Sequence, residues 1–296
     1  MNEKLLSIII PTLNRDKVLI NTIKDLLNQD YKSFEIIIID QSDIISKELM
    51  HFVEKYQQIK YFHIDEKGSP NAKNVGAKLA KGDILLFLDD DVEISAKKFL
   101  NFHLENFENK DIAVVAGRVL QNGDRPLNKV KEVGRYKFFG LIGRSDFNAD
   151  FRSENIDYAL AGNQSIRKSV FMSVGGFSKI FKGNAYFEET DFGLRIKKAG
   201  YRIVFDPRAK LKHLQYQSGG HRRIADIYKL RYWIAYNTLI FYLRNFPHIL
   251  LSIYSLKIIV WAMFSAIKRW DYKIFSSMMR GLVDGIKFYN KYDFNS

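Results

Sequence analysis

Three consecutive aspartates, Asp89, Asp90 and Asp91, follow a short apolar run and form a candidate metal site. Carboxylates this close together raise one another's pKa, and a hard divalent cation such as Mg²⁺ or Mn²⁺ would offset their charge. Magnesium keeps few protein carboxylates and takes its other ligands from phosphates. The alternative is a solvated acidic turn that caps the next helix, and the three aspartates alone do not decide between the two.

A second acidic cluster begins a predicted helix and contains Glu188, Glu189 and Asp191. Carboxylates in the first turn of a helix are ordinary partners of its dipole. One of them could instead be a general base that removes a proton from an acceptor hydroxyl. Arg195 lies one turn after Asp191 and could pair with it to keep it ionised.

His213 follows a basic run and precedes a polar stretch that contains the glycines 219–220. Neutral imidazole is a good third metal ligand, although a single histidine is more often structural or exposed. His221 is the competing candidate, and the arginine pair 222–223 beside it suggests contact with phosphate. The two glycines would let this loop fold over a ligand.

The first half of the chain alternates strand and helix patterns that would position these residues. Apolar runs predict strands at 5–10, 35–40, 59–64 and 84–88, with helices at 16–28, 46–56 and 71–80. Continuous apolar strands between helices indicate a mostly parallel sheet covered on both faces. In such sheets ligands bind beyond the carboxyl ends of the strands, so we expect one binding edge there.

Several weaker candidates lie at or near this edge. The segment from Thr12 to Arg15 follows the first strand, where backbone N–H groups and the arginine could meet a phosphate or base. Asp40 ends the second strand and could accept from a nucleobase or ribose, while Lys73 and Asn74 could face a nucleotide. Each could equally be a turn former or part of a solvated face, so their joint placement is the informative observation.

The remaining pattern is less regular. Strands are expected at 112–119, 160–166 and 201–205, with helices at 168–174 and 188–199. Residues 122–155 have no clear period and are interpreted as a loop-rich insertion with a short helix near 129–136. From about residue 224 onward the pattern is helical and strongly aromatic.

Composition limits the function classes. Of the 296 residues 47% are hydrophobic and 27% charged, which is typical of a globular protein. With no cysteine, disulfides, thiol nucleophiles and cysteine zinc sites are excluded. The net charge of +13 points to a polyanionic partner: nucleic acid, an anionic membrane or a phosphate-bearing ligand. No apolar run of signal-peptide length precedes the first strand, so we expect a cytoplasmic protein.

The positive charge belongs to the last third. Residues 207–296 hold 15 Lys and Arg against 4 Asp and Glu, together with 18 of the 42 aromatic residues. Within this tail, residues 248–267 are apolar apart from Lys257 and scattered serines, and basic and aromatic residues flank them. That arrangement suits a membrane interface with anionic lipids.

Other interpretations of residues 248–267 remain open. A transmembrane helix needs roughly 20 apolar residues, and Pro247 and Lys257 weaken that interpretation. A buried helical hairpin would show the same apolar pattern. Single-stranded nucleic-acid binding also combines basic and aromatic residues, but the acidic motifs already account for a nucleotide ligand, so no nucleic-acid partner is expected.

Taken together and in this order, five segments resemble the family 2 (GT-A fold) nucleotide-sugar glycosyltransferases. The similarity covers roughly residues 5–215 and is greatest to bacterial enzymes of the rhamnosyl-, galactofuranosyl- and polysaccharide-assembling kind. The segments are SIIIPTLNR (7–15), ID (39–40), AKNVG (72–76), FLDDDV (87–92) and EETDFGLRIKKAGYR (188–202).

The resemblance implies a Rossmann-like α/β fold, with a catalytic domain over 1–220, and the basic aromatic pattern predicts a helical, membrane-associating region over 221–296. The resemblance also implies site roles. Nucleotide-sugar contacts fall on Pro11, Thr12, Asn14, Arg15, Asp40, Lys73, Asn74, Asp89 and Asp90, with Asp40 on a base that is usually uracil or thymine. Asp89, Asp91 and His213 would hold the metal, and Gly162 and Asn163 would lie on the acceptor side.

The catalytic base is the one departure from the family pattern. Glu189 falls where the family usually has aspartate, which adds one methylene of reach and leaves Asp191 as a rival base. The resemblance implies an inverting transfer, dependent on Mn²⁺ or Mg²⁺, from a UDP- or dTDP-sugar to a glycan or lipid-linked acceptor in cell-surface polysaccharide synthesis. The enzyme would work at the inner face of the cell membrane. The alternatives are a nucleotidyltransferase and a non-catalytic nucleotide- or nucleic-acid-binding module.

Overall fold

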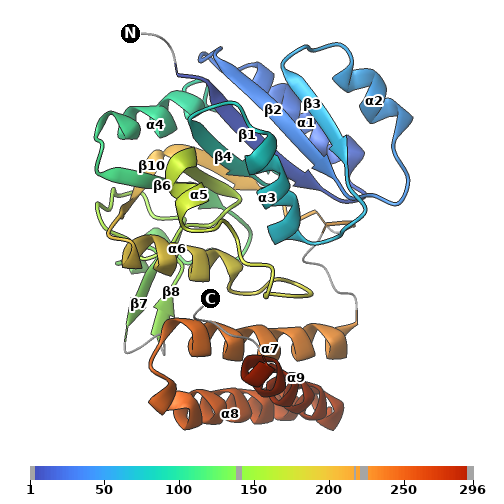
Figure 1. The fold of residues 1–296 in the computed structure, drawn as a ribbon, viewed down its shortest axis with the longest axis vertical. Coiled ribbons are helices and arrows are strands. Elements are labelled where there is room, and N and C mark those ends of the chain that lie inside the picture. Colours follow the sequence, from blue (N-terminus) through green and yellow to red (C-terminus); the bar gives the residue numbers. More distant parts are fainter. Residues whose placement is uncertain (1–3, 138–141, 217, 221–225, 292–296) are drawn as a thin grey trace.

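The computed structural model describes residues 4–137, 142–216, 218–220 and 226–291, and within them eight strands form one sheet in the order β3-β2-β1-β4-β9-β6-β10-β5 (Figure 1). The strands are β1 (Leu6–Thr12), β2 (Phe34–Asp40), β3 (Ile59–His63), β4 (Ile84–Leu88), β5 (Val92–Glu93), β6 (Ile112–Leu120), β9 (Asn163–Arg167) and β10 (Arg202–His213). The helices before residue 200 are α1 (Asp16–Leu27), α2 (Lys47–Val53), α3 (Ser69–Leu79), α4 (Phe99–Glu105), α5 (Lys168–Ser173) and α6 (Glu188–Lys198), with a 3₁₀ turn at Asn106–Glu108.

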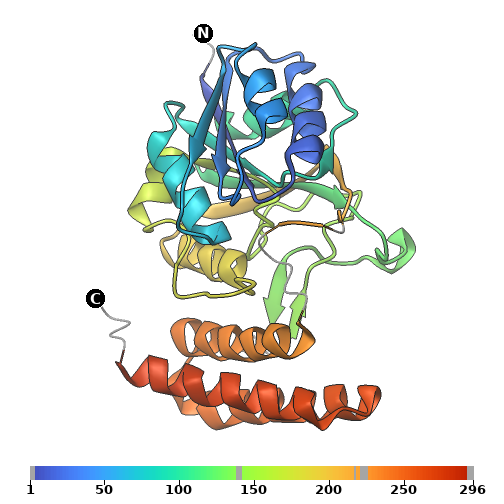
Figure 2. The ribbon, with the colours of Figure 1, turned by 90° about the vertical axis from the view of Figure 1, so that its right-hand side faces the viewer.

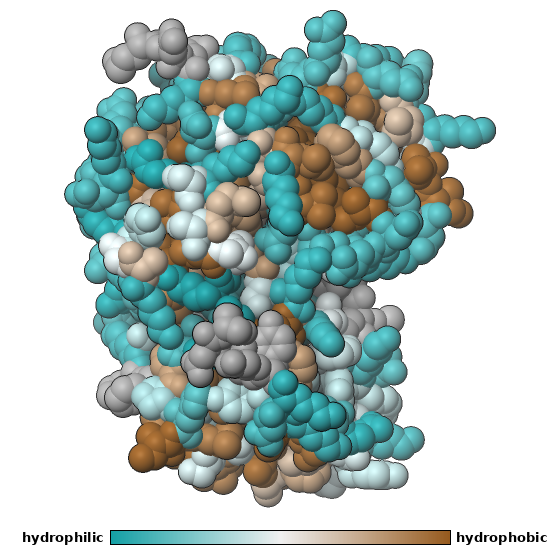
Figure 3. Space-filling model, in the orientation of Figure 1, coloured by the Kyte–Doolittle hydropathy of each residue, from teal (hydrophilic) through white to brown (hydrophobic). Residues whose placement is uncertain are grey.

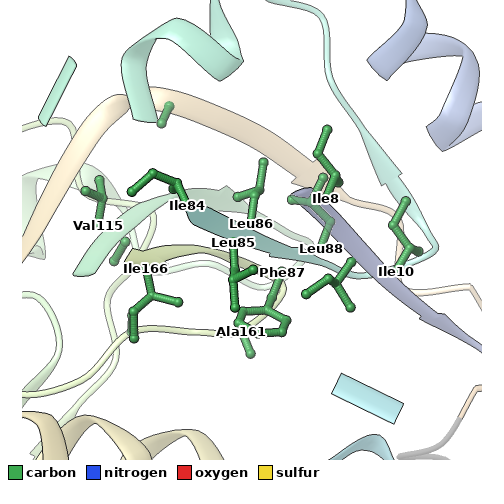
Figure 4. Close-up of a cluster of buried hydrophobic side chains, with 14 of the residues drawn as sticks. Ile8, Ile10, Ile84, Leu85, Leu86, Phe87, Leu88, Val115, Ala161 and Ile166 are labelled. Atoms are coloured by element: carbon green, nitrogen blue, oxygen red, sulfur yellow. The ribbon is translucent and has the colours of Figure 1, made fainter. Parts of the chain in front are cut away.

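Strands β3, β2, β1 and β4 are parallel, as their continuous apolar runs predict. Every residue of β1, β2 and β4 is buried because both faces of the sheet are covered, with α1 on one side and α3 on the other (Figure 2). Along β4 the side chains alternate, with Leu86 on the face that Ile8 shares and Leu85 and Phe87 on the opposite face (Figure 4). Helix α3 packs so closely on β1 that a Cβ on Gly76 would lie 2.4 Å from Ile9 Cγ2.

The other half of the sheet is mixed. Strand β9 runs antiparallel between β4 and β6, and β5 pairs antiparallel with β10. Strand β10 continues to His213, well beyond the predicted end at 205, because after a bulge between Asp206 and Lys210 it pairs again with β6 and then with β5. The predicted α/β fold with a mostly parallel sheet is confirmed, and this extension carries His213 to the acidic edge.

The predicted short helix near 129–136 is wrong. The chain makes a 3₁₀ turn at Leu127–Lys129 and then a hairpin of β7 (Arg135–Lys137) and β8 (Ile142–Arg144). Gly134 has a φ of +53°, which ends any helix there, and the Tyr136 amide donates to Asp157 Oδ2 at 2.7 Å. The hairpin is therefore fixed by a contact 21 residues away that local sequence does not reveal.

The C-terminal helices α7 (Ile227–Asn245), α8 (Leu251–Arg269) and α9 (Tyr272–Lys291) form a layer beneath α6 and the β7–β8 hairpin (Figures 1 and 2), and a 3₁₀ turn at His248–Leu250 precedes α8. Helix α7 is apolar around most of its circumference because it is buried on two sides. Tyr236 and Phe241 pack with Phe181 of the sheet domain, while Leu239 packs with Met278 of α9.

Candidate active site

Asp89, Asp90 and Asp91 follow β4, which is the parallel neighbour of β1, so they share an edge with the segment after β1. Asp90 is buried: Thr12 Oγ1 donates to its Oδ2 at 2.8 Å, and Arg15 Nη1 donates to its Oδ1 at 2.9 Å. Burial raises the pKa of Asp90 to about 6, while Arg15 opposes this rise and the charge of Asp91 adds to it. Asp90 therefore anchors the acidic loop to the segment that follows β1.

Asp91 is also buried and joins the same loop to the end of β10. His213 Nε2 lies 3.1 Å from its Oδ1, and the Tyr216 amide donates to its Oδ2 at 2.8 Å. Arg15 Nη1 lies 3.2 Å from the same Oδ2. Burial alone would raise the pKa of Asp91, but His213, the Tyr216 amide and Arg15 together hold it below its usual value.

Asp89 is the member of the trio that reaches solvent, since its side chain is 34% exposed and Asp91's is 1% exposed. Its Oδ2 lies 4.0 Å from His213 Nε2. The same oxygen lies so close to Gly162 that a Cβ on this residue would be 2.2 Å from it. A larger residue at position 162 would therefore displace the Asp89 carboxylate.

The donor set of Asp89, Asp91 and His213 suits a divalent cation in its chemistry, because two carboxylates and one imidazole are ligands that Mn²⁺ accepts and Mg²⁺ tolerates. Within the described ranges, however, no group of three His, Asp or Glu side chains forms a ready-made cage. Arg15 and His213 also compensate part of the acidic charge that the sequence alone assigns to a metal. A cation here would take further ligands from its substrate. The competing ligand His221 lies outside the described residues.

Arg15 joins the segment after β1 to the segment after β10. Its Nε donates to the Ser218 carbonyl at 2.8 Å and its Nη2 to the Tyr216 carbonyl at 3.0 Å. The Gly220 amide donates to the Leu13 carbonyl at 2.9 Å, so the chain after β10 folds over the segment after β1. The guanidinium predicted to meet a nucleotide is thus engaged with Asp90, Asp91 and this loop. The arginine pair 222–223 lies outside the described residues.

A cavity of about 500 Å³ opens where β1 and β2 end, and it brings together Thr12, Asn14, Arg15 and Asp40 as the sequence predicts. Asp40 accepts from the Ser42 amide and hydroxyl at 2.8 and 2.5 Å and from the Tyr61 hydroxyl at 2.7 Å. Pro11 is buried in β1 opposite Ile39 and is not among the lining residues. The apolar part of the wall, which sequence reasoning missed, consists of Ile44, Ile45 and Leu49.

Lys73 and Asn74 lie away from this cavity. Lys73 Nζ lies 2.8 Å from Glu188 Oε1 and 3.6 Å from Glu189 Oε1, and it sits over the ring of Phe177. Asn74 holds both the N–H and the C=O of Phe177, at 2.9 and 2.7 Å. Lys73 therefore joins α3 to α6, and Asn74 joins α3 to the segment that follows α5.

The second acidic cluster divides by environment. Asp191 is fully buried, and its carboxylate meets Arg195 Nε at 2.9 Å, Arg244 Nε at 3.2 Å and Asn245 Nδ2 at 2.9 Å. Glu189 lines a cavity of about 270 Å³ with four aromatic residues, Tyr136, Tyr158, Tyr186 and Phe187. Geometry therefore gives the two rival bases different surroundings, and only Glu189 of the pair lines a cavity in the described residues.

Asn163 lies in the core. Its Nδ2 donates to the carbonyls of Arg118 and Ala209 at 3.0 and 2.9 Å, and its Oδ1 lies 3.0 Å from His103 Nε2. With donors and acceptor engaged, Asn163 ties β9 to β6 and β10. Both Gly162 and Asn163 are expected on the acceptor side. The structure places Gly162 next to Asp89 and Asn163 in the core behind the sheet edge.

A further cavity, of about 490 Å³, lies next to both the cavity with Asp40 and the cavity with Glu189, since its lining residue Leu13 stands in the chain between Thr12 and Asn14. Leu13 and Gly220 line it at the nucleotide end, and Ala185 is shared with the cavity that contains Glu189. Three lysines, Lys67, Lys179 and Lys182, also line it. Two of the three are paired, Lys67 with Asp43 and Lys179 with Glu66, and Glu66 lines the same cavity. A ligand that extends from the ends of β1 and β2 toward α6 would therefore pass a wall that carries both signs of charge, with lysine in excess.

A family profile described as Glycosyl transferase family 2 matches residues 7–175, more than half of the chain. The chain belongs to glycosyl transferase family 2. This membership confirms the glycosyltransferase class and the family that the five segments indicate.

Curated relatives of this family 2 chain include characterised bacterial enzymes. Over 175 residues it is 31% identical to the poly(ribitol-phosphate) beta-N-acetylglucosaminyltransferase TarP of Staphylococcus aureus, covering 56% of this chain and 50% of that protein. Over 93 residues it is 41% identical to a GalNAc(5)-diNAcBac-PP-undecaprenol beta-1,3-glucosyltransferase of Campylobacter jejuni, covering 30% of each. The chain spans half the length or less of these curated relatives.

Solved structures agree on the fold of this family 2 chain. The S. aureus TarS 1–349 complex with UDP-GlcNAc aligns with a TM-score of 0.54 at 20% identity, covering 79% of this chain and 66% of that one. The mannosyltransferase PcManGT of Pyrobaculum calidifontis, in complex with GDP-Man and Mn²⁺, aligns with a TM-score of 0.58 at 14% identity, covering 95% and 75%. At these identities the similarity confirms the GT-A-type α/β fold.

In this family 2 chain, helix α7 supplies contacts that sequence reasoning missed. Asn237 donates from Nδ2 to the Lys182 carbonyl at 2.8 Å and accepts from the Lys182 amide at 3.1 Å. Arg244 and Asn245, at the other end of α7, hold Asp191. Phe241 stacks on Phe187 with ring centroids 4.4 Å apart. The C-terminal helices thus fix the segment that leads into α6, across the boundary predicted at 220.

Proposed function

We propose that this protein transfers a sugar from a nucleoside-diphosphate donor, such as a UDP- or dTDP-sugar, to a hydroxyl of a glycan or lipid-linked acceptor, with inversion at the anomeric carbon. The carrying observation is a row of three neighbouring cavities. It runs from Asp40 at the end of β2, past Leu13 and the three lysines, to Glu189 at the start of α6. That order matches a base, a diphosphate and a sugar that meets its acceptor.

Glu189 is the proposed catalytic base. It lines the aromatic cavity where an acceptor sugar ring would lie, and Lys73 Nζ lies 3.6 Å from its Oε1. Its carboxylate would take the proton from the acceptor hydroxyl while that oxygen attacks opposite the departing diphosphate. Holding both substrates in adjacent cavities would supply much of the remaining rate. Asp191, enclosed by Arg195, Arg244 and Asn245, would instead hold α6 in place.

Asp89, Asp91 and His213 would hold Mn²⁺ or Mg²⁺, and such an ion supplies charge that offsets the negative charge on the leaving diphosphate. The donor chemistry of the three side chains supports this assignment, as does the Mn²⁺ in the PcManGT complex. Asp40, Ser42 and the apolar side chains of Ile44 and Ile45 would hold the nucleobase, because they combine a polar edge with an apolar wall.

The proposed place of work is the cytoplasmic face of an anionic membrane, where an acceptor carried by a lipid for cell-surface polysaccharide synthesis would be found. The basic excess of residues 207–296 supports it. TarP and the Campylobacter enzyme, named for poly(ribitol-phosphate) and for a PP-undecaprenol-linked glycan, support this acceptor class.

Product analysis tests the reaction. The purified protein is incubated with UDP-, dTDP- and GDP-sugars, with and without Mn²⁺, and the released nucleotide is identified. Release of nucleoside diphosphate that requires the metal and is lost in Glu189→Gln supports the proposal. Release of pyrophosphate would identify a nucleotidyltransferase. Binding of nucleotide with no turnover of any donor, with lipid-linked acceptors present, would indicate a non-catalytic module.

A further inference from the structure

One face of α8 is apolar and exposed along its whole length. We call Ile253, Leu256, Val260, Met263, Phe264 and Ile267 the α8 apolar face; their side chains are between 41% and 68% exposed. Spacings of three and four residues place them in one stripe. The opposite face carries Tyr254, Ile258 and Ala262, which are fully buried against the other C-terminal helices. In the space-filling view, apolar residues gather at the lower edge of the molecule, where α8 lies (Figure 3).

The surroundings of this face are basic and aromatic. Lys257 and Lys268 each follow a residue of the stripe directly, so they lie along its edge. Beyond the end of α8, Trp270 is 95% exposed and Tyr272 is 77% exposed. Residues 227–291 hold ten Lys and Arg against two Asp, and no Glu. An apolar stripe bordered by cations and ended by Trp and Tyr matches the layers of an anionic lipid surface.

We propose that the α8 apolar face lies in the headgroup region of an anionic bilayer, with the axis of α8 parallel to the membrane plane. This inference rests on the membrane location in the proposed function and gives it a specific surface. Such a helix buries its apolar side about 5–10 Å into the boundary between headgroups and acyl chains. Lys268 and Arg269 then meet lipid phosphates, and Trp270 lies at the interface.

A membrane span does not fit the packing. His248–Arg269 is long enough and apolar enough to cross a bilayer, with a mean hydropathy of 1.9 over its most apolar 18 residues. Tyr254, Ile258 and Ala262, however, pack α8 against α7 and α9, which carry Lys229, Arg231 and Lys287. Crossing would either strip α8 from these partners or take charged helices into hydrocarbon, and both are costly.

A second copy of the chain fits less well than lipid. In a two-fold dimer the α8 apolar face would meet itself, because such interfaces use the same patch on both subunits. Lys257, Lys268 and Arg269 of each copy would then border the interface together with those of the partner copy, so like charges would gather at its rim. Anionic headgroups turn this positive edge from a repulsive contact into an attractive one.

The proposed orientation also places the reaction near the membrane. Helix α7 lies between α8 and α6, contacts both, and holds Lys182 and Asp191 on its other side (Figure 2). The Glu189 cavity, walled by Phe187 on Phe241, is therefore one helix layer from the lipid surface. A hydroxyl on a sugar attached to a lipid carrier could reach this cavity while the lipid part of the carrier stays in the bilayer.

The first test is co-sedimentation of the full chain with vesicles of phosphatidylglycerol and phosphatidylcholine, compared with phosphatidylcholine alone. The double variant Leu256→Glu/Phe264→Glu places two charges on the face, and Leu127→Glu, at a 44% exposed residue of the sheet domain, is the matched control. Wild type and the control should bind anionic vesicles in a salt-sensitive way. The double variant should lose at least about tenfold in partitioning while melting as the wild type does.

Binding by the double variant equal to that of wild type, or equal binding to neutral vesicles, would overturn the inference. Wild type that withstands alkaline carbonate extraction would show a span instead. A dimer in sedimentation equilibrium that the double variant dissociates, with no vesicle binding by wild type, would assign the face to a second copy. Vesicle binding requires no donor, so nucleotide release in solution, measured in parallel, separates failure of this inference from failure of the proposed reaction.

Brominated lipids give an independent measure of depth. Quenching of Trp fluorescence in bound wild type, reduced in Trp270→Phe, would place this residue at the interface, and bromine near the headgroup end of the acyl chain should quench most. No quenching at any bromine position, with vesicle binding intact, would contradict the proposed orientation of α8.

Discussion

Asn245 Nδ2 donates to Asp191 Oδ1 at 2.9 Å, and this bond links the last residue of α7 to the first turn of the helix that begins with the acidic cluster. Arg244 and Arg195 complete the enclosure of the same carboxylate. The second acidic cluster thus holds two carboxylates, two residues apart, with different surroundings: Glu189 lines a cavity and Asp191 faces the C-terminal layer.

Replacing Asp191 with alanine should destabilise the protein by about 3 kcal/mol, because two partly buried guanidinium groups and Asn245 would lose a fully buried carboxylate. The change is measured as a fall in the free energy of unfolding in urea. Asp43→Ala removes an exposed carboxylate that pairs with Lys67, and it should cost no more than about 1 kcal/mol. Equal effects of the two variants would show that Asp191 is not an anchor.

Glu189→Gln should lower turnover of donor and acceptor by about 10²–10⁴-fold, since the amide cannot accept the acceptor proton. Donor binding and melting temperature should stay near those of wild type, because the side chain lines a cavity rather than the core. Single-turnover kinetics with a titration of donor binding separate the two effects. A variant with full turnover would remove Glu189 from the role of base.

Asp89→Asn should abolish the rise in melting temperature that Mn²⁺ and UDP produce together, because it weakens the most exposed ligand of the proposed set. His213→Ala should reduce that rise. Asp30→Asn, a change at an exposed aspartate outside the site, is the control and should keep it. An undiminished shift in Asp89→Asn would place the metal elsewhere.

Acid should destabilise the fold through His103. Its Nδ1 lies 2.8 Å from Ser165 Oγ and its Nε2 3.0 Å from Asn163 Oδ1, and complete burial lowers its pKa from 6.5 to about 4. Between these values the unfolded chain binds more protons than the folded one, so stability is full above pH 6.5 and is lost as the pH falls toward 4. From about pH 8 to about pH 5 the loss from this residue is about 2 kcal/mol.

The measurement compares urea unfolding of wild type and His103→Gln at both pH values, since glutamine does not titrate. The fall in stability should be about 2 kcal/mol smaller in the variant. The comparison is needed because Asp90, whose pKa is raised on folding, contributes in the opposite direction: it gains stability as the pH falls through about 6. Identical pH dependence in the two proteins would rule out His103 as the source.

The strands and the binding edge were predictable because they depend on local patterns. Continuous apolar runs such as β1 and β4 determine which segments are buried, and parallel pairing then brings Thr12, Asp40 and Asp89 to one edge. No tertiary information is needed for that step. The position of His213 near the acids is predicted from the family resemblance and not from these local patterns.

The partners of individual side chains were not predictable. Lys73 lies on the expected helix, but which way α3 is turned depends on the close packing of Gly76 against Ile9, and this turns Lys73 to Glu188. Asp90 meets Arg15 across 75 residues of chain, so three adjacent aspartates overstate the uncompensated charge. Asn163, a polar residue within the strand predicted at 160–166, is expected on the acceptor side, and its contact with His103 is not visible in the sequence.

The register between β10 and β5 sets His213 opposite Val92, one residue after Asp91. Side chains along a strand alternate between its two faces, so a shift of one residue would send the imidazole to the other side of the sheet and away from the carboxylates. The distance between the His213 imidazole and the carboxylates of Asp89 and Asp91 is therefore set by the pairing of β10 with β5. An insertion or deletion of one residue anywhere between the bulge of β10 and His213 would erase the ligand set while leaving every ligand present in the sequence.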